Sequence, residues 1–187
     1  TTKTSLLSLL RHSPHNPTQQ IPLLLRHNRR LISTCIIGAG PSGFYSAKFL
    51  SQALQKMMET RSQSDSSAFV PPQSYSITLL DRYPTPFGLV RYGVAPDHPE
   101  VKNVTKEFER ILQQENINFI GNVTVGGAKG SGVSIQELRE MFDVVILSYG
   151  ADNERKLWIP NEDLIESARD FVHFYNGLPD AEKREQM

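Results

Sequence analysis

Residues 38–43 combine a residue type and a spacing that suit the binding of a phosphate-containing ligand. Their sequence is GAGPSG, so that glycines stand at positions 38, 40 and 43. In a Gly-x-Gly-x-x-Gly pattern the first glycine allows a sharp turn and the second leaves room for a pyrophosphate beside the backbone. The third lets a helix lie close to a strand. The pattern predicts a dinucleotide site, with a plain glycine turn in an unliganded α/β domain as the alternative.

The segments on either side of this pattern support the dinucleotide interpretation. Residues 31–37 are a short apolar run that predicts a buried strand ending at the glycines. After them, Ala47, Leu50 and Leu54 recur at helical spacing and share a face with Gly43. A strand that enters a glycine turn and continues as a helix is the context that a dinucleotide fingerprint requires. The anionic pyrophosphate would face the helix N-terminus, where unpaired amides attract it.

Asp81 is the second candidate for binding chemistry, because it closes a predicted strand at Ser76–Leu80. An acid in this position accepts hydrogen bonds from the adenosine ribose. It comes 38 residues after Gly43, where about 20 is usual. A Ser/Gln-rich surface loop at residues 59–74 accounts for the excess. A carboxylate repels a 2′-phosphate, so the site suits FAD or NAD rather than NADP(H). The spacing does not choose between FAD and NAD.

Residues 84–99 hold four prolines and two glycines, a density that argues against regular helix or central strand. The same stretch contains several large apolar side chains that either the core or a ligand must cover. These are Phe87, Leu89, Val90, Tyr92 and Val94.

The rest of the chain predicts alternating helices and strands. Together with the glycine turn, this order predicts an α/β protein with a Rossmann-like, doubly wound parallel sheet. The expected elements are a helix over about Glu100–Glu115 buried through Val101, Val104, Phe108, Ile111 and Leu112, a strand at Asn116–Val125, a flexible turn at Gly126–Gly132, a helix at Ile135–Met141, a buried strand at Asp143–Tyr149, and a helix at Leu164–Asn176 with Gly177 as its C-cap.

Composition narrows the function classes. The chain has 187 residues and a formal net charge of zero, which gives no indication of nucleic-acid binding. Residues 1–34 contain five Lys and Arg residues and no acid, the composition of an organelle transit peptide or a disordered leader. No apolar run reaches the length of a membrane span. Cys35 is the only cysteine and lies in an apolar run, which favours core packing.

Longer strings then resemble one family. PFGLVRYGVAPDHPEVKNV at residues 86–104 closely resembles the segment after the second strand in adrenodoxin-type ferredoxin–NADP reductases. The resemblance covers roughly residues 35–180 and continues through IGNVTVG (120–126), VVILSYGA (144–151), IP (159–160), SAR (167–169) and FYNGLP (174–179). It implies FAD on this domain, NADPH on a second Rossmann domain, and a [2Fe–2S] ferredoxin (adrenodoxin) as electron acceptor. It also implies the mitochondrial matrix, with peripheral association at the inner membrane.

The family pattern assigns roles to residues of this chain. Members usually have glutamate where this chain has Asp81, which is one methylene shorter. The resemblance also implies that FAD covers the apolar segment at 86–96. The residues assigned to FAD are Gly38, Gly40, Ser42 and Gly43 at the pyrophosphate, Asp81 at the ribose, Gly88 and Leu89 against the cofactor, and Val125 at the adenine.

Four further positions have two interpretations each. His98 either assists proton transfer near the flavin or is a structural histidine in a turn. Arg91 either neutralises cofactor charge or pairs with Asp97. We expect Trp158 to pack within the protein rather than stack on the flavin. Gly150-Ala151 either ends a strand against the cofactor or forms an ordinary turn.

The sequence after FYNGLP bears on the domain organisation. Only ten residues follow Gly177, and none is a glycine, so a second glycine turn for NADPH is not expected in this chain. We expect residues 1–34 to be a leader, 35–180 an FAD domain, and 181–187 a charged tail at a domain boundary. The chain would then be a part of the reductase that is inactive alone. The alternatives are a catalytically inactive FAD-fold subunit of a larger assembly, and another FAD- or NAD-dependent oxidoreductase such as a glutamate synthase small-subunit-like domain.

Overall fold

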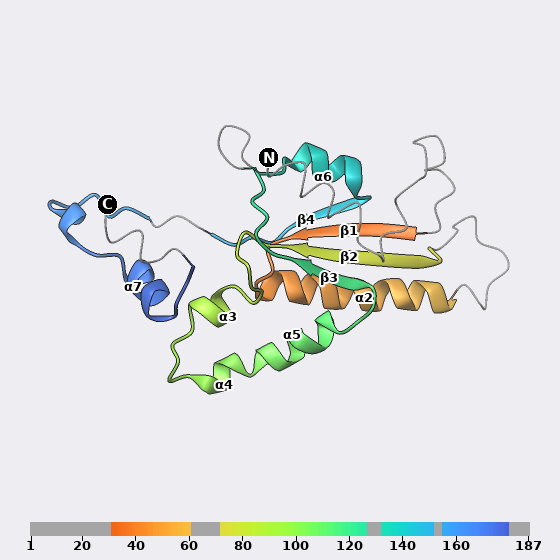
Figure 1. The fold of residues 1–187 in the computed structure, drawn as a ribbon, viewed down its shortest axis with the longest axis horizontal. Helices are drawn as coiled ribbons and strands as arrows, with labels where there is room; N and C mark the ends of the chain where they lie inside the picture. Colours follow the sequence, from red (N-terminus) through yellow and green to blue (C-terminus); the bar gives the residue numbers. More distant parts are fainter. Residues whose placement is uncertain (1–30, 61–71, 127–131, 152–154, 180–187) are drawn as a thin grey trace.

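The computed structural model describes residues 31–60, 72–126, 132–151 and 155–179. Most of the expected leader, of the insertion at 59–74 and of the turn at 126–132, and the whole tail at 181–187, lie outside these ranges. The described residues form a parallel sheet in the order β3-β2-β1-β4 (Figure 1). Its strands are β1 (Leu31–Ile37), β2 (Ser74–Leu80), β3 (Ile117–Ile120) and β4 (Val144–Leu147). The predicted α/β architecture with a parallel sheet is confirmed.

The strands end in register at one edge of the sheet. Ile37, the last residue of β1, is level with Leu80 of β2 and Leu147 of β4. Leu80 is in turn level with Ile120 of β3. The chain adds β2 and β3 on one side of β1 and β4 on the other, so the order reverses between β1 and β4. In open α/β sheets, ligands bind outside the carboxyl ends of the strands at such a reversal.

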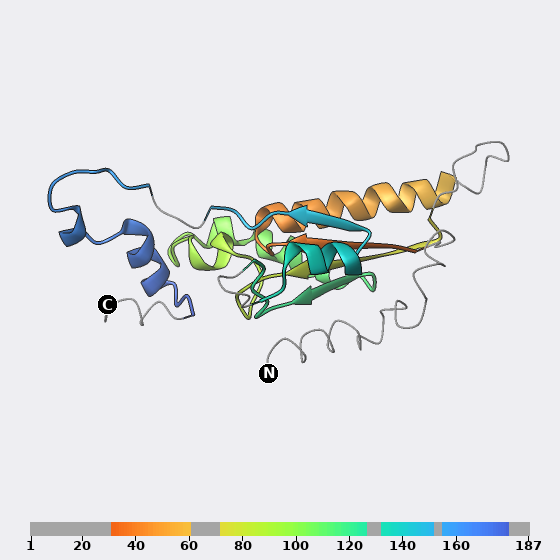
Figure 2. The ribbon, with the colours of Figure 1, turned by 90° about the horizontal axis from the view of Figure 1, so that it is seen from above.

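Helices cover both faces of the sheet. The helices α2 (Pro41–Thr60) and α5 (Val104–Leu112) lie on one face, and α6 (Ile135–Met141) lies on the other (Figures 1 and 2). Alternate residues of β1 enter the two cores, as the period of a strand requires. Ile36 packs in the core beneath α2 and α5, whereas Cys35 and Ile37 pack in the core beneath α6.

The helix expected over residues 100–115 is divided in the structure. It consists of α4 (Pro99–Lys102) and α5, with Asn103 between them. The N–H of Asn103 bonds the Glu100 carbonyl, and the N–H of Lys106 bonds the Asn103 carbonyl, which is the tighter i to i+3 pattern. The prediction that Val101 is buried is wrong, since its side chain is 50% exposed. The buried stripe begins only in α5.

The strands β3 and β4 differ from expectation in length and burial. The chain leaves the sheet after Ile120, because the N–H of Asn122 bonds Tyr83 and the N–H of Val123 bonds Asp81. β4 covers only residues 144–147 and is an edge strand, so it is not buried as predicted. Leu147 is 53% exposed.

Two expectations about helices are corrected and one is confirmed. The helix α3 (Leu89–Tyr92) is one turn, bounded by Gly88 and Gly93, in the stretch predicted to contain none. The helix expected at 164–176 is a short 3₁₀ turn, η5 (Glu162–Leu164), followed by α7 (Ala168–Tyr175). Gly177 follows α7 with a φ of 68° and its N–H bonds the Phe174 carbonyl, so the predicted C-terminal glycine is confirmed.

Candidate functional site

The glycine turn joins β1 to α2 at the carboxyl edge of the sheet, and two of its glycines are required by packing. Gly38 has a φ of 106°, and a Cβ on it would lie 2.4 Å from the carbonyl oxygen of Ser148. A Cβ on Gly43 would lie 2.0 Å from the carbonyl oxygen of Gly38. Both distances are impossible for a real side chain. Gly38 therefore allows the turn to lie against the segment after β4, and Gly43 allows α2 to start close to the turn.

Gly40 has different surroundings. The nearest atom to a Cβ built on Gly40 is the Cα of Gly88, at 4.0 Å, so the protein itself has room for a side chain there. The Gly40 carbonyl accepts the N–H of Phe44 at 3.0 Å and starts α2, whose first residue is Pro41. Among the described residues no acceptor bonds the N–H of Gly40. Ser42 is exposed, and its N–H lies in the first turn, where a helix offers no acceptor.

Asp81 lies directly beside this turn. Its Oδ2 accepts the N–H of Ala39 at 2.8 Å, and its Oδ1 accepts the N–H of Tyr83 at 3.0 Å. The side chain is half-buried. Each carboxylate oxygen can accept more than one hydrogen bond, so both retain capacity for a hydroxyl donor. The fold thus brings the carboxylate to the turn across 42 residues of sequence.

The segment after β2 folds back over the glycine turn. The N–H of Phe87 donates to the carbonyl of Ala39 at 2.7 Å. Gly88 follows with a φ of 49°, and a Cβ on it would lie 3.0 Å from the Cα of Gly40. Leu89, the next residue, is 64% exposed. Gly88 thus lies close against Gly40, and the exposed Leu89 follows it directly in the chain.

The expectation that a cofactor covers the apolar segment at 86–96 is wrong for three of its side chains. Phe87, Val90 and Tyr92 are buried by the protein itself. Phe87 packs against Phe44 of α2 and Phe108 of α5, with ring centroids 5.3 and 5.9 Å away. The sequence left core and ligand open as the two possible covers, and the core covers these three residues.

Three further residues that the sequence singled out have partners within the protein. His98 is exposed, with Nδ1 3.1 Å from Oε1 of Glu100. Arg91 donates from Nε to the carbonyl of Pro86 at 3.0 Å. Val125 is half-buried and forms a single bridge with Val133.

Two positions near the end of the described chain are exposed. Trp158 is 83% exposed, which contradicts its expected packing within the described part of the protein. Gly150 has a φ of 72°, and nothing lies within 4 Å of a Cβ built on it.

Burial controls the chemistry of Cys35. The thiol is fully buried, and desolvation raises its pKa to about 12. It is therefore protonated at neutral pH and does not act as a nucleophile, which agrees with the expected packing role.

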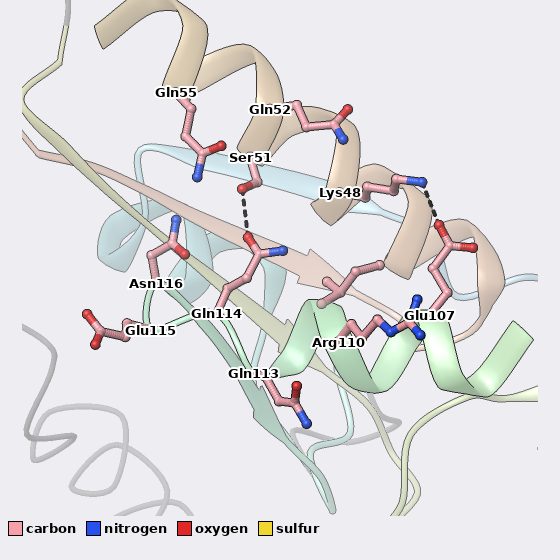
Figure 3. Close-up of a pocket in the computed structure, with 11 residues that line it drawn as sticks. Lys48, Ser51, Gln52, Gln55, Glu107, Arg110, Gln113, Gln114, Glu115 and Asn116 are labelled. Carbon is pink, nitrogen blue, oxygen red and sulfur yellow. Dashed lines mark hydrogen bonds and ion pairs between the residues drawn. The ribbon is translucent and has the colours of Figure 1, made fainter. Parts of the chain in front are cut away.

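The structure also contains a groove that the sequence did not predict. It has a volume of about 730 Å³ and lies between α2 and the segment 107–116, which runs from α5 to the start of β3 (Figure 3). Lys48 and Glu107 form an ion pair of 2.5 Å across it. Ser51 Oγ lies 2.8 Å from the Tyr75 hydroxyl and donates to Oε1 of Gln114 at 3.1 Å. Four of the polar side chains that line it thus have protein partners.

A parallel sheet whose strand order reverses beside a glycine turn defines a Rossmann-like α/β domain. The chain is 44% identical over 153 residues to the NADPH:adrenodoxin oxidoreductase, mitochondrial, of Arabidopsis thaliana. It is 42% identical over 153 residues to the protein of the same name from Homo sapiens. Each match covers 81% of this chain, and the chain spans about a quarter of the length of these relatives, 27% and 26%.

A solved structure gives the same result. FprA, a Mycobacterium tuberculosis oxidoreductase, matches with a TM-score of 0.63 and 37% identity over 81% of this chain and 30% of FprA. Another structure of FprA contains NADPH. No protein-family model matches the chain. The predicted resemblance to the adrenodoxin-type reductases is confirmed, and the chain is a homologue of part of these enzymes.

Proposed function

We propose that this chain forms the FAD-binding part of an NADPH-dependent reductase of a [2Fe–2S] ferredoxin. The observation that carries the proposal is the room at Gly40, whose N–H has no acceptor among the described residues and whose neighbour Ala39 bonds the Asp81 carboxylate. A side chain at Gly40 would fill this space, so the residues present fit a cofactor diphosphate there.

Each residue of the turn has a binding role in this proposal. The N–H groups of Gly40 and Ser42, at the N-terminus of a 20-residue helix, would donate to the diphosphate. Gly43 allows that helix to start close to the turn, and Gly38 allows the turn to lie against the segment after β4. Asp81 would accept hydrogen bonds from the ribose hydroxyls. Because it is a carboxylate, it would repel a cofactor with a 2′-phosphate at this position.

The neighbouring apolar groups would contact the cofactor rings. Leu89, exposed beside Gly88, would pack on the cofactor, and Val125 would contact the adenine. When bound, FAD would supply the conversion between two-electron and one-electron transfer. His98 is exposed and paired with Glu100, and we assign it no step.

The relatives support the parts of the proposal that concern NADPH, the ferredoxin and the location in the cell. Because the chain spans about a quarter of their length, we propose that NADPH binding and ferredoxin reduction require more than the residues described. The relatives are named mitochondrial, and we propose a mitochondrial location, in the matrix, with peripheral association at the inner membrane. No helix in the described ranges is long and apolar enough to cross a membrane.

A titration of the flavin-free chain with FAD, NAD⁺ and NADP⁺ tests the proposal. We expect one FAD per chain, with a shifted visible spectrum and quenched flavin fluorescence, and no NADP⁺ binding. Addition of NADPH to the FAD-loaded chain should leave the flavin oxidised. Binding of NAD⁺ without FAD would favour a different oxidoreductase, and ferredoxin reduction by this chain alone would contradict the assignment of NADPH binding to other residues.

A further inference from the structure

Phe87 has a backbone conformation that an aromatic residue rarely adopts. Its φ is 92°, in the left-handed region that favours glycine. The ring is buried and is held between Phe44 of α2 and Phe108 of α5. Such a conformation persists only where the surrounding structure fixes the residue from several sides. The ring supplies that fixation, because it connects Phe87 to two helices.

The strained residue makes one hydrogen bond to the glycine turn. Its N–H donates to the Ala39 carbonyl at 2.7 Å. The N–H of Ala39 is itself bound to Oδ2 of Asp81 at 2.8 Å. Both polar groups of Ala39 are thus fixed, one by Asp81 and one by Phe87, which lie in the same segment after β2.

The geometry of the peptide bond carries this constraint to Gly40. The carbonyl of Ala39 and the N–H of Gly40 belong to one peptide unit, and no cis peptide occurs among the described residues. In a planar trans peptide the carbonyl and the N–H point in opposite directions. A carbonyl held toward Phe87 therefore holds the Gly40 N–H away from Phe87, on the side where no described protein group accepts it.

We propose that Phe87 is a positioning residue for the dinucleotide site: through its amide and its anchored ring it orients the Gly40 N–H toward the cofactor diphosphate. This inference rests on the proposed function, because it assigns the diphosphate to that N–H. It differs from a packing role, in which the ring would stabilise the core without any effect on the turn.

Phe108 provides a matched control. It is fully buried in the same aromatic cluster, with its ring 4.7 Å from that of Phe44, but the hydrogen bonds of the described residues do not connect it to the turn. Phe87→Leu and Phe108→Leu remove the same ring from the same core. If Phe87 only packs, the two variants should lose flavin affinity in the same proportion to their loss of stability.

The test compares the two variants in the flavin-free 187-residue chain by amide hydrogen exchange, and then by FAD titration. We expect exchange of the amides at positions 39 and 87 to accelerate at least tenfold in Phe87→Leu beyond any global change, and to follow global stability in Phe108→Leu. The FAD dissociation constant should rise about tenfold more in Phe87→Leu than in Phe108→Leu. If either leucine variant does not fold, Phe87→Met and Phe108→Met, whose longer and more flexible side chains adapt to the space of the ring, give the same comparison.

The outcomes separate this inference from the proposed function. Equal FAD affinity and equal exchange in the two variants would overturn the positioning role while FAD binding by the unmodified chain still supports the function. If the unmodified chain does not bind FAD, the proposed function fails and the cofactor role of Phe87 fails with it. Accelerated exchange at positions 39 and 87 would then support only its hold on the turn.

Discussion

The glycine turn and the groove between α2 and α5 are two regions of this molecule with different properties. The groove offers a volume of about 730 Å³, and the ion pair of Lys48 with Glu107 and the bonds of Ser51 involve four of its polar side chains. The turn offers a missing side chain at Gly40 and a backbone N–H with no described acceptor. Four side chains of the groove have protein partners, whereas the N–H of Gly40 has none among the described residues.

This difference indicates how an anion site is recognised in a structure. A diphosphate binds to fixed donors that have no other partner, and it needs backbone that no side chain covers. The groove has no glycine among its lining residues, so it offers no backbone free of a side chain. The turn is therefore the better candidate site. Variants in the two regions should separate effects on stability from effects on flavin binding.

The largest expected effect comes from Gly43→Ala. The added Cβ would lie 2.0 Å from the Gly38 carbonyl oxygen, and that atom belongs to the backbone and cannot rotate away. Either α2 moves off the sheet or the turn opens, at a cost of about 3 kcal/mol or more. Urea denaturation of the flavin-free chain measures this loss. A variant as stable as the unmodified chain would show that the turn is looser than its geometry indicates.

Gly40→Val should separate binding from folding. The Cβ of the new side chain meets only the Cα of Gly88, at 4.0 Å, and we expect the apo protein to lose about 1 kcal/mol or less. The same side chain fills the space assigned to the diphosphate, and the FAD dissociation constant should rise at least about a hundredfold. FAD titration and urea denaturation of one preparation measure both quantities. Unchanged flavin content in this variant would remove Gly40 from the site.

Asp81→Asn should affect both properties to a moderate extent. The amide can accept only one of the two N–H groups, from Ala39 and Tyr83, that the carboxylate accepts now. We expect a loss of about 1–2 kcal/mol in stability and a rise of roughly tenfold in the FAD dissociation constant, since the ribose also loses a charged acceptor. Asp81→Glu is the control and should keep FAD affinity within about threefold, because it retains the charge. If Asp81→Asn binds FAD normally, the carboxylate serves only the backbone.

How much of this arrangement the sequence predicts depends on whether the determining contacts are local. The bounds of β1 and α6 were predicted residue for residue. Gly38 ends the first, and the structure shows that a Ser134–Glu137 capping box starts the second. The position of Asp81 beside the turn followed from the parallel order of the strands. These features depend on signals within a few residues or on a general rule of the fold.

Contacts between distant segments were not predictable. The ring of Phe87 is buried by Phe44 and Phe108, which lie 43 and 21 residues away in sequence, so core and ligand remained equal alternatives. The bond of Asp81 to Ala39 gives the carboxylate a second, structural task that a fingerprint does not contain. The groove was missed because its lining is polar and comes from α2 and the α5–β3 connection together.

The smallest expected effect lies in the groove and completes the comparison. Ser51→Ala removes the hydrogen-bond partner of the buried Tyr75 hydroxyl and a donor to Gln114. We expect a loss of about 1 kcal/mol in stability, partly offset by the higher helix propensity of alanine. Gln52→Ala, an exposed residue one position along the helix, is the control and should change stability by about 0.5 kcal/mol or less.

Neither groove variant should change the FAD dissociation constant by more than about twofold, because neither residue contacts the turn among the bonds described. With Gly40→Val this gives two opposite results: one variant loses flavin and stays folded, and the other loses stability and keeps flavin. If Ser51→Ala lowered FAD affinity more than its loss of stability explains, the groove would influence the glycine turn. The unpaired N–H of Gly40 would then no longer be enough to locate the cofactor site.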